Sequence, residues 1–342
     1  MKNHRRNQGA LCLLLIGVLV TLAPAILATS GAITVFDPAD SAGTSPSSIN
    51  NKGTITGLYV DKSTFNVRGF VRDEQGAVTV FDPTNSTNTH PLSINDKGAI
   101  TGYYSTTDTP RGFVRDEQGA ITLFDPTNSK YTFPVGINNK GAITGSYFDT
   151  STSTFHGFVR DEQGAITVFD PTDSAGTFPG GINDKGAITG SYSDKSTGTP
   201  RGFVRDELGA ITVFDATSSK NTAPTSINNE GAITGFYLDK SSGTPRGFVR
   251  DEPGAITVFD PTDSNSTRPA SINDKGAITG FYLDKSSGTP RGFVRDEQGA
   301  ITLFDPTNSK YTFPVGINNK GAITGNYYDV SLRSHGFVRA AP

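Results

Sequence analysis

Hydrophobic and polar residues alternate in short runs along the whole chain, and the same runs return in a fixed order. Each unit carries Ile-Thr-Val-Phe or a close variant, then Ile-Thr-Gly-x-Tyr, then Gly-Phe-Val-Arg. These runs are rich in β-branched and aromatic residues, are bounded by Gly, Pro, Asp and Asn, and show no helical period. The pattern therefore predicts short β-strands and no helix.

The units repeat seven times at a nearly constant period. The opening glycines give steps of 45, 43, 45, 45, 45 and 45 residues; they are Gly31, Gly76, Gly119, Gly164, Gly209, Gly254 and Gly299. A fixed period indicates an array of one supersecondary unit. Polar segments that end in glycine, such as 95–98 and 116–119, are typical of tight hairpins. Each unit is therefore predicted to be a four-stranded antiparallel meander, strands a to d, of the size of a β-propeller blade.

The two ends of the array predict how it closes. The repeats begin with a lone strand d at 31–37 and finish with strand c at 336–339, so the strand that the last unit lacks lies at the other end. We predict a seven-bladed β-propeller in which the N-terminal strand completes the last blade, because this arrangement removes exposed sheet edges. An open β-solenoid is the alternative.

The N-terminus has the pattern of a secretory signal. Three basic residues precede an apolar stretch at 11–22, and small residues follow. We predict a signal peptide at 1–28, with cleavage after Ala25 or Ala28, and one propeller domain at 29–342. The protein is then expected to be secreted or extracellular, with the periplasm as an alternative, and to have no membrane span. Retention of the segment as a signal anchor stays open, because its apolar length approaches that of a membrane span.

Composition excludes several classes of function. The chain has 30 basic and 33 acidic residues, and no basic run follows the signal, so we expect no nucleic-acid partner. Cys12 is the only cysteine and lies in the predicted signal, so disulfides and thiolate chemistry are not expected. No histidine has partners at metal-ligand spacing, and we predict no metal and no cofactor. We expect a monomer.

The near-identity of the units argues against catalysis. Residues 115–145 and 295–325 match at all 31 positions, whereas an enzyme on a repeat fold needs a unique constellation of groups. No nucleophile elbow or phosphate-binding loop occurs. The two segments 170–174 and 260–264, Asp-Pro-Thr-Asp-Ser, are interpreted as turns and not as cation sites. The arginine that ends each strand c is expected to pair with the Asp-Glu that usually follows it.

One position varies while its surroundings repeat. In the predicted connection from strand d to strand a, the residue between Thr and Pro is Ser45, His90, Phe133, Phe178, Ala223, Arg268 or Phe313. We expect these side chains at the mouth of the central channel, on the face that carries the d-to-a and b-to-c connections. Aromatic rings beside polar groups are typical of ligand sites. The predicted ligand-binding residues are His90, Tyr131, Phe133, Phe178, Arg268, Tyr311 and Phe313. The alternative is that the phenylalanines only cover the blade ends.

The units resemble the bacterial extracellular repeat known as the HAF family. The motif His-x-Phe of that family is matched by 156–158 and 335–337, and arginine replaces the histidine at Arg68, Arg111, Arg201, Arg246 and Arg291. The resemblance covers 31–339. It implies secretion and a propeller-like fold, and it implies no particular activity.

From the residues we predict a secreted, non-catalytic repeat protein. It would bind an extracellular partner, a glycan or a protein, through the face of the d-to-a connections. An enzyme, a lyase or hydrolase with its site in the central channel, is one alternative. A purely structural component of an envelope or matrix is the other.

Overall fold

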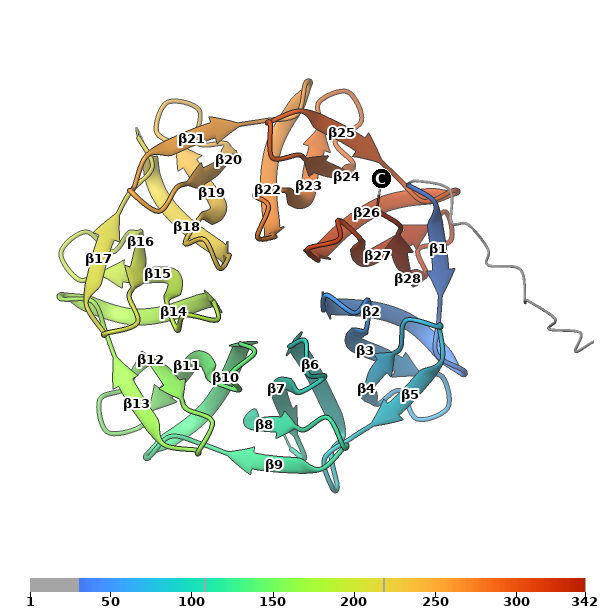
Figure 1. Cartoon of the computed structure of the whole chain (residues 1–342), viewed down its shortest axis with the longest axis horizontal. Coiled ribbons are helices and arrows are strands. Elements are labelled where there is room, and N and C mark those ends of the chain that lie inside the picture. The colour runs from blue at the N-terminus through green and yellow to red at the C-terminus, as the bar shows by residue number, and fades with distance from the viewer. Residues whose placement is uncertain (1–30, 108, 218, 342) are drawn as a thin grey trace, which may run out of the picture.

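The repeats form a ring of β-sheets around a central axis (Figure 1). The structure, a computed structural model, describes residues 31–107, 109–217 and 219–341. Within them lie 28 strands and no helix, in four-stranded antiparallel meanders. The predicted all-β architecture of four-stranded blades is therefore confirmed. The predicted signal peptide lies outside the described residues.

Strand a of each blade lies nearest the axis and strand d lies at the rim (Figure 1). The a strands are β2 (Ser41–Ile49), β6 (Asn88–Ile94), β10 (Ser129–Ile137), β14 (Ser174–Ile182), β18 (Ser219–Ile227), β22 (Ser264–Ile272) and β26 (Ser309–Ile317). The b strands are β3 (Ile55–Asp61), β7 (Ile100–Ser105), β11 (Ile143–Asp149), β15 (Ile188–Asp194), β19 (Ile233–Asp239), β23 (Ile278–Asp284) and β27 (Ile323–Asp329).

The two outer strands of each blade complete the meander. The c strands are β4 (Val67–Arg72), β8 (Arg111–Arg115), β12 (Thr154–Arg160), β16 (Pro200–Arg205), β20 (Pro245–Arg250), β24 (Pro290–Arg295) and β28 (Ser334–Arg339). The d strands are β1 (Ile33–Phe36), β5 (Val78–Phe81), β9 (Ile121–Phe124), β13 (Ile166–Phe169), β17 (Ile211–Phe214), β21 (Ile256–Phe259) and β25 (Ile301–Phe304). We number the blades by their a strands, so blade 1 begins with β2 and blade 7 with β26. A single parallel bridge between Val67 and Asn88 links the sheets of blades 1 and 2.

The inner strands begin earlier than the sequence pattern predicts. The pattern indicates a strand only around the Ser-Ile that precedes the Asn turn, whereas β2 begins at Ser41 and runs through Pro46. An edge strand is hydrogen-bonded to its sheet on one side only and tolerates a proline, and the pairing shifts register between Pro46 and Ser48. The variable position between Thr and Pro therefore lies inside strand a, and its expected place in the connection before the strand is wrong.

The N-terminal strand pairs with the last one. β1 runs antiparallel to β28, from Ile33 opposite Arg339 to Phe36 opposite Gly336, and the sheet order is β1-β28-β27-β26. The Phe36 ring also meets Phe70 of blade 1 edge-on, with ring centres 5.9 Å apart. The first strand of the fold thus contacts both the last blade and the first.

The same aromatic contact holds every pair of neighbouring blades together. A strand d phenylalanine packs edge-on against the fully buried strand c phenylalanine of the next blade, as Phe124 does against Phe158 at 6.1 Å. The arginine that ends strand c covers the first ring, with Arg160 5.1 Å from the centre of Phe124. Its Nη1 donates to the backbone carbonyl of Asp161. The expected pairing of these arginines with the following carboxylates is therefore wrong, because their guanidinium groups pack on phenylalanine rings and bond to a backbone oxygen.

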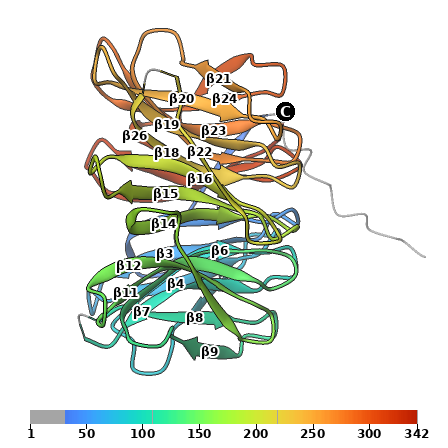
Figure 2. The ribbon, with the colours of Figure 1, turned by 90° about the vertical axis from the view of Figure 1, so that its left-hand side faces the viewer.

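The strands cross the ring between two faces, which Figure 2 shows edge-on. The a-to-b and c-to-d turns lie on one face, which we call the turn face. The b-to-c and d-to-a connections lie on the other, which we call the loop face. This separation follows from the antiparallel meander, since every second connection returns to the same side.

Removal of residues 31–37 should destabilise the whole ring. β28 would keep β27 but lose its outer partner, and Phe70 and Arg72 would lose the Phe36 ring. Truncation of a buried aromatic residue costs roughly 3 to 5 kcal/mol, so we expect the melting temperature to fall by about 5 °C or more. The matched control is Val35→Thr, a change at a side chain that is 44% exposed on the same strand. Thermal unfolding by circular dichroism measures both; a truncated protein that melts like the intact one contradicts the prediction.

Candidate functional site

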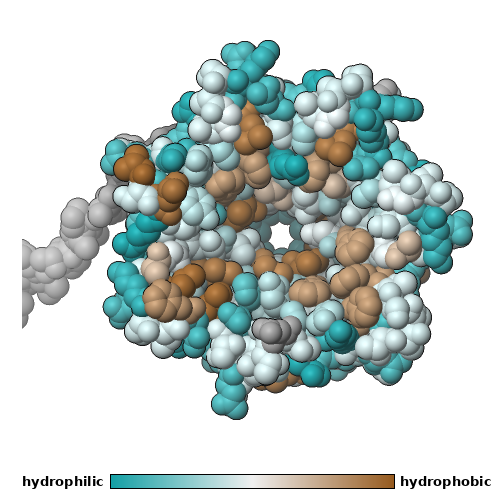
Figure 3. All heavy atoms as spheres, turned by 180° about the vertical axis from the view of Figure 1, so that it is seen from behind, coloured by the Kyte–Doolittle hydropathy of each residue, from teal (hydrophilic) through white to brown (hydrophobic). Residues whose placement is uncertain are grey.

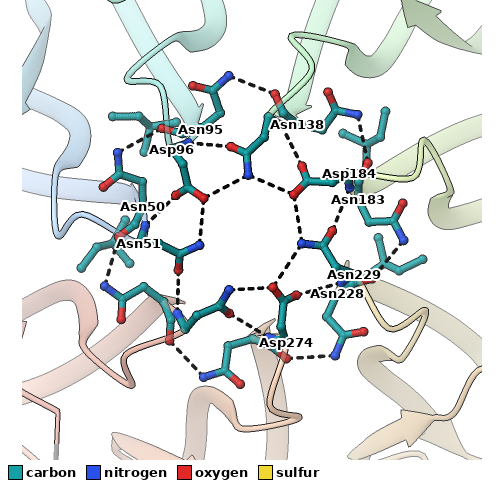
Figure 4. A pocket seen from close by; sticks show the side chains of 18 of the residues that line it. Asn50, Asn51, Asn95, Asp96, Asn138, Asn183, Asp184, Asn228, Asn229 and Asp274 are labelled. Carbon is teal, nitrogen blue, oxygen red and sulfur yellow. Dashed lines mark hydrogen bonds between the residues drawn. The ribbon is translucent and has the colours of Figure 1, made fainter.

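A circle of asparagines surrounds the central channel at the turn face (Figure 4). The Asn50 amide nitrogen donates to the backbone carbonyl of Asn95 in the next blade at 3.0 Å, and Asn318 donates in the same way to Asn50. The members are Asn50, Asn95, Asn138, Asn183, Asn228, Asn273 and Asn318. Each side-chain oxygen accepts two backbone N–H groups of its own turn, as Asn50 does from Lys52 and Thr54. These buried amides are thus satisfied by two neighbouring turns.

A second circle lies one residue further along each turn, where Asn and Asp alternate. Its members are Asn51, Asp96, Asn139, Asp184, Asn229, Asp274 and Asn319. Each side chain accepts a backbone N–H from the preceding blade, as Asp96 Oδ1 does from Asn51 at 2.8 Å. The bond from Asn319 N to Asn51 Oδ1 joins blades 7 and 1 at 2.7 Å. The carboxylates also accept hydrogen bonds from side-chain amides, since Nδ2 of Asn139 and Nδ2 of Asn229 both donate to Asp184 Oδ2.

The two circles enclose the narrow part of the channel. Its cavity of 160 Å³ is lined by isoleucine, asparagine and aspartate side chains, and none of the seven predicted site residues lines it. Within 31–107, 109–217 and 219–341, no group of three or more His, Cys, Asp or Glu could hold a metal ion. The circles join the blades, and the predicted site residues lie elsewhere.

Four of the predicted site residues meet in one aromatic cluster across blades 2, 3 and 4. His90 stacks on Tyr103 with ring centres 4.5 Å apart, and Tyr103 meets Phe133 at 5.3 Å. The row continues from Phe133 through Phe155 to Phe178, at 6.4 and 5.5 Å. We call the whole set aromatic cluster 1: His90, Tyr103, Tyr131, Phe133, Phe148, Phe155 and Phe178. The structure therefore brings these residues together between blades.

Aromatic cluster 1 presents a neutral surface to solvent. Phe178 is 41% exposed, and its ring leans on Gly176, where a Cβ atom would approach it to 3.3 Å. Burial lowers the pKa of His90 below its usual value, so the imidazole is neutral at pH 7. One face of the Phe178 ring is thus held by the protein while the side chain remains exposed to solvent.

The other three predicted residues lie in a second cluster across blades 5, 6 and 7. Phe313 meets Phe281 at 5.1 Å and Tyr328 at 6.1 Å. The Arg268 guanidinium lies 4.4 Å from the centre of the Phe236 ring. We call this set aromatic cluster 2: Phe236, Arg268, Phe281, Tyr311, Phe313 and Tyr328.

Three residues of each cluster were not singled out from the sequence: Tyr103, Phe148 and Phe155 in the first, and Phe236, Phe281 and Tyr328 in the second. Tyr103 and Phe281 follow the glycine of Ile-Thr-Gly-x-Tyr and are the cross-strand partners of His90 and Arg268. This strand b position also varies, as Leu58, Tyr103, Ser146, Ser191, Phe236, Phe281 and Asn326. Its variation is the signal that would have found them. Two variable positions therefore face each other within every blade.

Further apolar side chains project from the b-to-c loops of the adjacent blades 7 and 1. Phe65 is 75% and Leu332 is 55% exposed, and both have a left-handed backbone, with φ of 59° and 65°. The corresponding turns of blades 4, 5 and 6 use glycine there, at φ of 67° to 69°. A side chain in this region costs about 1 to 2 kcal/mol. Figure 3, seen from the side opposite to Figure 1, shows hydrophobic surface gathered around the channel opening.

The outer part of the loop face carries the same contact seven times. The Arg201 Nε donates to Asp215 at 2.8 Å, and where histidine replaces arginine the His156 Nδ1 lies 2.6 Å from Asp170. The pairs are Arg68–Asp82, Arg111–Asp125, His156–Asp170, Arg201–Asp215, Arg246–Asp260, Arg291–Asp305 and His335–Asp37. Asp173, the second aspartate of its Asp-Pro-Thr-Asp segment, has a left-handed φ of 61°. In this segment Asp170 pairs with His156 and Asp173 has a left-handed backbone, and both observations support the interpretation of the segment as a turn.

A further carboxylate ends strand b and orders the b-to-c loop. Asp194 Oδ1 accepts the Ser196 hydroxyl at 2.6 Å and the Ser196 N–H at 2.9 Å. The serine hydroxyl and the backbone N–H groups lower the pKa of Asp61, Asp194 and Asp284 to about 2. These loops therefore depend on ionised carboxylates.

Comparison with known proteins identifies the fold and no family. No protein-family model matches the chain, and no curated protein matches it. A streptogramin B lyase superposes with a TM-score of 0.58 and 14% identity over 90% of this chain and 97% of its own. Virginiamycin B lyase from Staphylococcus aureus gives 0.60 and 14% over 90% and 99%, and the β-propeller domain of the Trilobed protease from Pyrococcus furiosus gives 0.63 and 11% over 87% and 95%. At these identities the likeness shows a β-propeller fold alone.

Replacement of one asparagine of the inner circle should destabilise the ring. Asn183→Ala removes the donor to Asn228 O and the acceptor for the N–H groups of Lys185 and Ala187. Because unsatisfied buried groups cost about 1 to 3 kcal/mol each, we expect unfolding in urea to lose about 2 to 3 kcal/mol. The control is Lys185→Ala at an exposed side chain of the same turn. Equal stability of the two variants would overturn this role of the asparagine.

Acid should weaken the b-to-c loops. Because the folded pKa of Asp61, Asp194 and Asp284 is about 2 and their ordinary value is 3.8, their contribution is complete above pH 4 and is lost as the pH falls to 2. Melting temperatures from pH 7 to 2 measure this loss. The triple variant with asparagine at all three positions should be less stable at pH 7 and show a shallower acid dependence. The same slope in both proteins speaks against the assignment.

Proposed function

We propose that the protein is a secreted, non-catalytic repeat protein that binds an extracellular partner, a glycan or another protein, through its loop face. The observation that carries this proposal is the pair of aromatic clusters. Phe133 and Phe313 lie in identical 31-residue segments, yet one is flanked by Phe155 and the other by Phe281. The blade-joining phenylalanines, in contrast, are the same in all seven units. Variation confined to partly exposed rings supports a role in recognition.

The chemistry of the loop face supports contact through apolar rings and hydrogen bonds. Aromatic side chains next to hydroxyl and imidazole groups are typical of surfaces that hold sugars or protein side chains. The repeated Arg–Asp pairs balance charge at the outer part of this face. Phe65 and Leu332 keep left-handed backbones where the turns of blades 4, 5 and 6 have glycine, and such strain is often retained for function.

A binding role is favoured over a lyase or hydrolase in the channel. The carboxylates that reach the narrow channel accept hydrogen bonds from neighbouring asparagines, in a pattern repeated from blade to blade. Such a pattern joins blades and gives every carboxylate the same hydrogen-bonding role. Catalysis, in contrast, needs groups with different roles, such as a nucleophile, a general base and a group that stabilises developing charge. A structural envelope component is the remaining alternative, and it predicts no specific ligand.

The proposal includes where the protein acts and how its ring is held. We propose that residues 1–28 are removed on secretion and that the units are related to the HAF repeats. The proposal also includes a monomeric state and closure of the ring by β1. The β1–β28 pairing and the bond from Asn318 to Asn50 support closure, and the basic and apolar N-terminal pattern supports secretion. In the part of the chain that the structure describes, no helix has the length and apolarity to span a membrane.

Replacing Phe133, Phe178 and Phe313 with serine should abolish binding to the proteins, and to the glycans without carboxylate groups, that the parent binds on a cell-surface panel and a glycan array. Phe178 is 41% exposed and Phe133 and Phe313 are half-buried, so the melting temperature should fall by only about 5 °C. The matched control replaces Leu123, Val168 and Leu303 with serine, three exposed residues on d strands. Retained binding by the phenylalanine variant overturns the proposed face. Failure of that variant to fold means that the rings close the blade ends, and this also overturns it.

A further inference from the structure

One of the clefts between neighbouring blades differs chemically from its sisters. It lies on the loop face between blades 4 and 5, has a volume of 490 Å³, and is lined by the b-to-c loop of blade 4, the end of β17 and the start of β18. The corresponding cleft between blades 5 and 6 measures 410 Å³. Both are large enough for one or two sugar residues. The difference between them therefore lies in their side chains.

The backbone of the first cleft is altered by one substitution. Strand d is followed by Asp-Pro in six units, whereas Asp215 is followed by Ala216. In five of the six units with proline, the strand a threonine donates to the aspartate, as Thr267 does to Asp260. Ala216 has an N–H group, and it donates to Thr222 Oγ1 at 3.2 Å. The Asp215 side chain is 35% exposed, compared with 19% for Asp260.

The charge of the cleft also differs. Its lining includes the cations Arg201, Lys220 and Lys240 and the carboxylates Asp194 and Asp215. Arg201 contacts Asp194 at 3.7 Å and Asp215 at 2.8 Å. With Lys220 and Lys240 there are three cations and two carboxylates, so the cleft has an excess of positive charge. In the sister cleft the position of Lys220 is occupied by an asparagine, and two cations face two carboxylates.

Lys220 is also released from the contact that its counterparts make. Lys130 and Lys310 occupy the same position in their own units, and each lies about 5 Å above the ring of the following tyrosine, at 5.0 and 5.3 Å. The residue after Lys220 is Asn221. The ammonium group of Lys220 is therefore available to the cleft, which it lines.

We propose that this cleft binds a carboxylate-bearing sugar residue of an extracellular polysaccharide. Lys220 and Lys240 attract the ligand carboxylate, and the exposed Asp215 accepts hydrogen bonds from its hydroxyl groups. Thr199 and Ser219 line the same cleft and supply hydroxyl groups of their own. A neutral sugar would leave the lysines without a partner, and a simple anion would leave Asp215 facing like charge. The inference names a ligand class for a site apart from both aromatic clusters, and it rests on the proposed binding role of the loop face.

The test is titration calorimetry of the full secreted protein with trigalacturonate at low salt. Lys220→Asn reproduces the sister cleft and should weaken binding roughly tenfold, since it removes a charge that contacts the ligand. Lys310→Asn is the matched control, the same change at the same repeat position, and should leave the affinity unchanged. Galactotriose, the neutral counterpart, should give no heat at about 5 mM.

Three results would overturn the inference: no binding of trigalacturonate, equal affinity in Lys220→Asn and the parent, or full competition by inorganic phosphate at the same concentration as the sugar. The last would identify a simple anion site. The phenylalanine-to-serine variant separates this inference from the proposed function, because it should still bind trigalacturonate. Loss of trigalacturonate binding by that variant, when it folds, would place the ligand on the aromatic clusters and overturn the cleft.

Discussion

The ring depends on one hydrogen bond repeated from blade to blade, the bond from an asparagine amide to the backbone of the next turn. Asn50 donates to Asn95 and accepts two N–H groups of its own turn, which an amide does from separate atoms and a carboxylate, having no donor when ionised, could not do. The bond joins the ends of all seven inner strands, each to the next. Further out in the same interfaces, the phenylalanine and the arginine pack together.

Constant residues and variable residues lie in different parts of each blade. The buried phenylalanines and asparagines that join blades are the same from unit to unit, whereas strand a and strand b carry variable residues toward the loop face, as in the pair His90 and Tyr103. A change at such a position alters a surface and leaves the blade contacts intact. This separation explains how a nearly symmetric chain can carry two unlike aromatic clusters and one cleft of distinct charge.

Much of the fold could be predicted from the sequence because hairpin glycines and strand runs are local signals. The start of strand a could not, since Ser41–Ile49 contains proline and polar residues and becomes a strand only as the inner edge of a sheet. The neighbours of the predicted site residues could not be predicted, because Tyr103 and Phe155 come from other strands. The cleft at Ala216 was beyond sequence reasoning, since it depends on where one backbone N–H points.

The odd number of blades has a consequence for how such a chain can change. Alternation of Asn and Asp cannot close around seven positions, and the one pair of like neighbours, Asn319 and Asn51, carries no charge and lies between the last and first blades. Recombination between near-identical repeats would readily add or drop a unit. Loss of the unit that carries Asn139 would set Asp96 beside Asp184 and place two carboxylates in contact around a narrow opening. Loss of the unit that carries Asp96 would instead set Asn51 beside Asn139, two side chains without charge. The identity of the lost unit therefore decides whether a shorter array could close without repulsion.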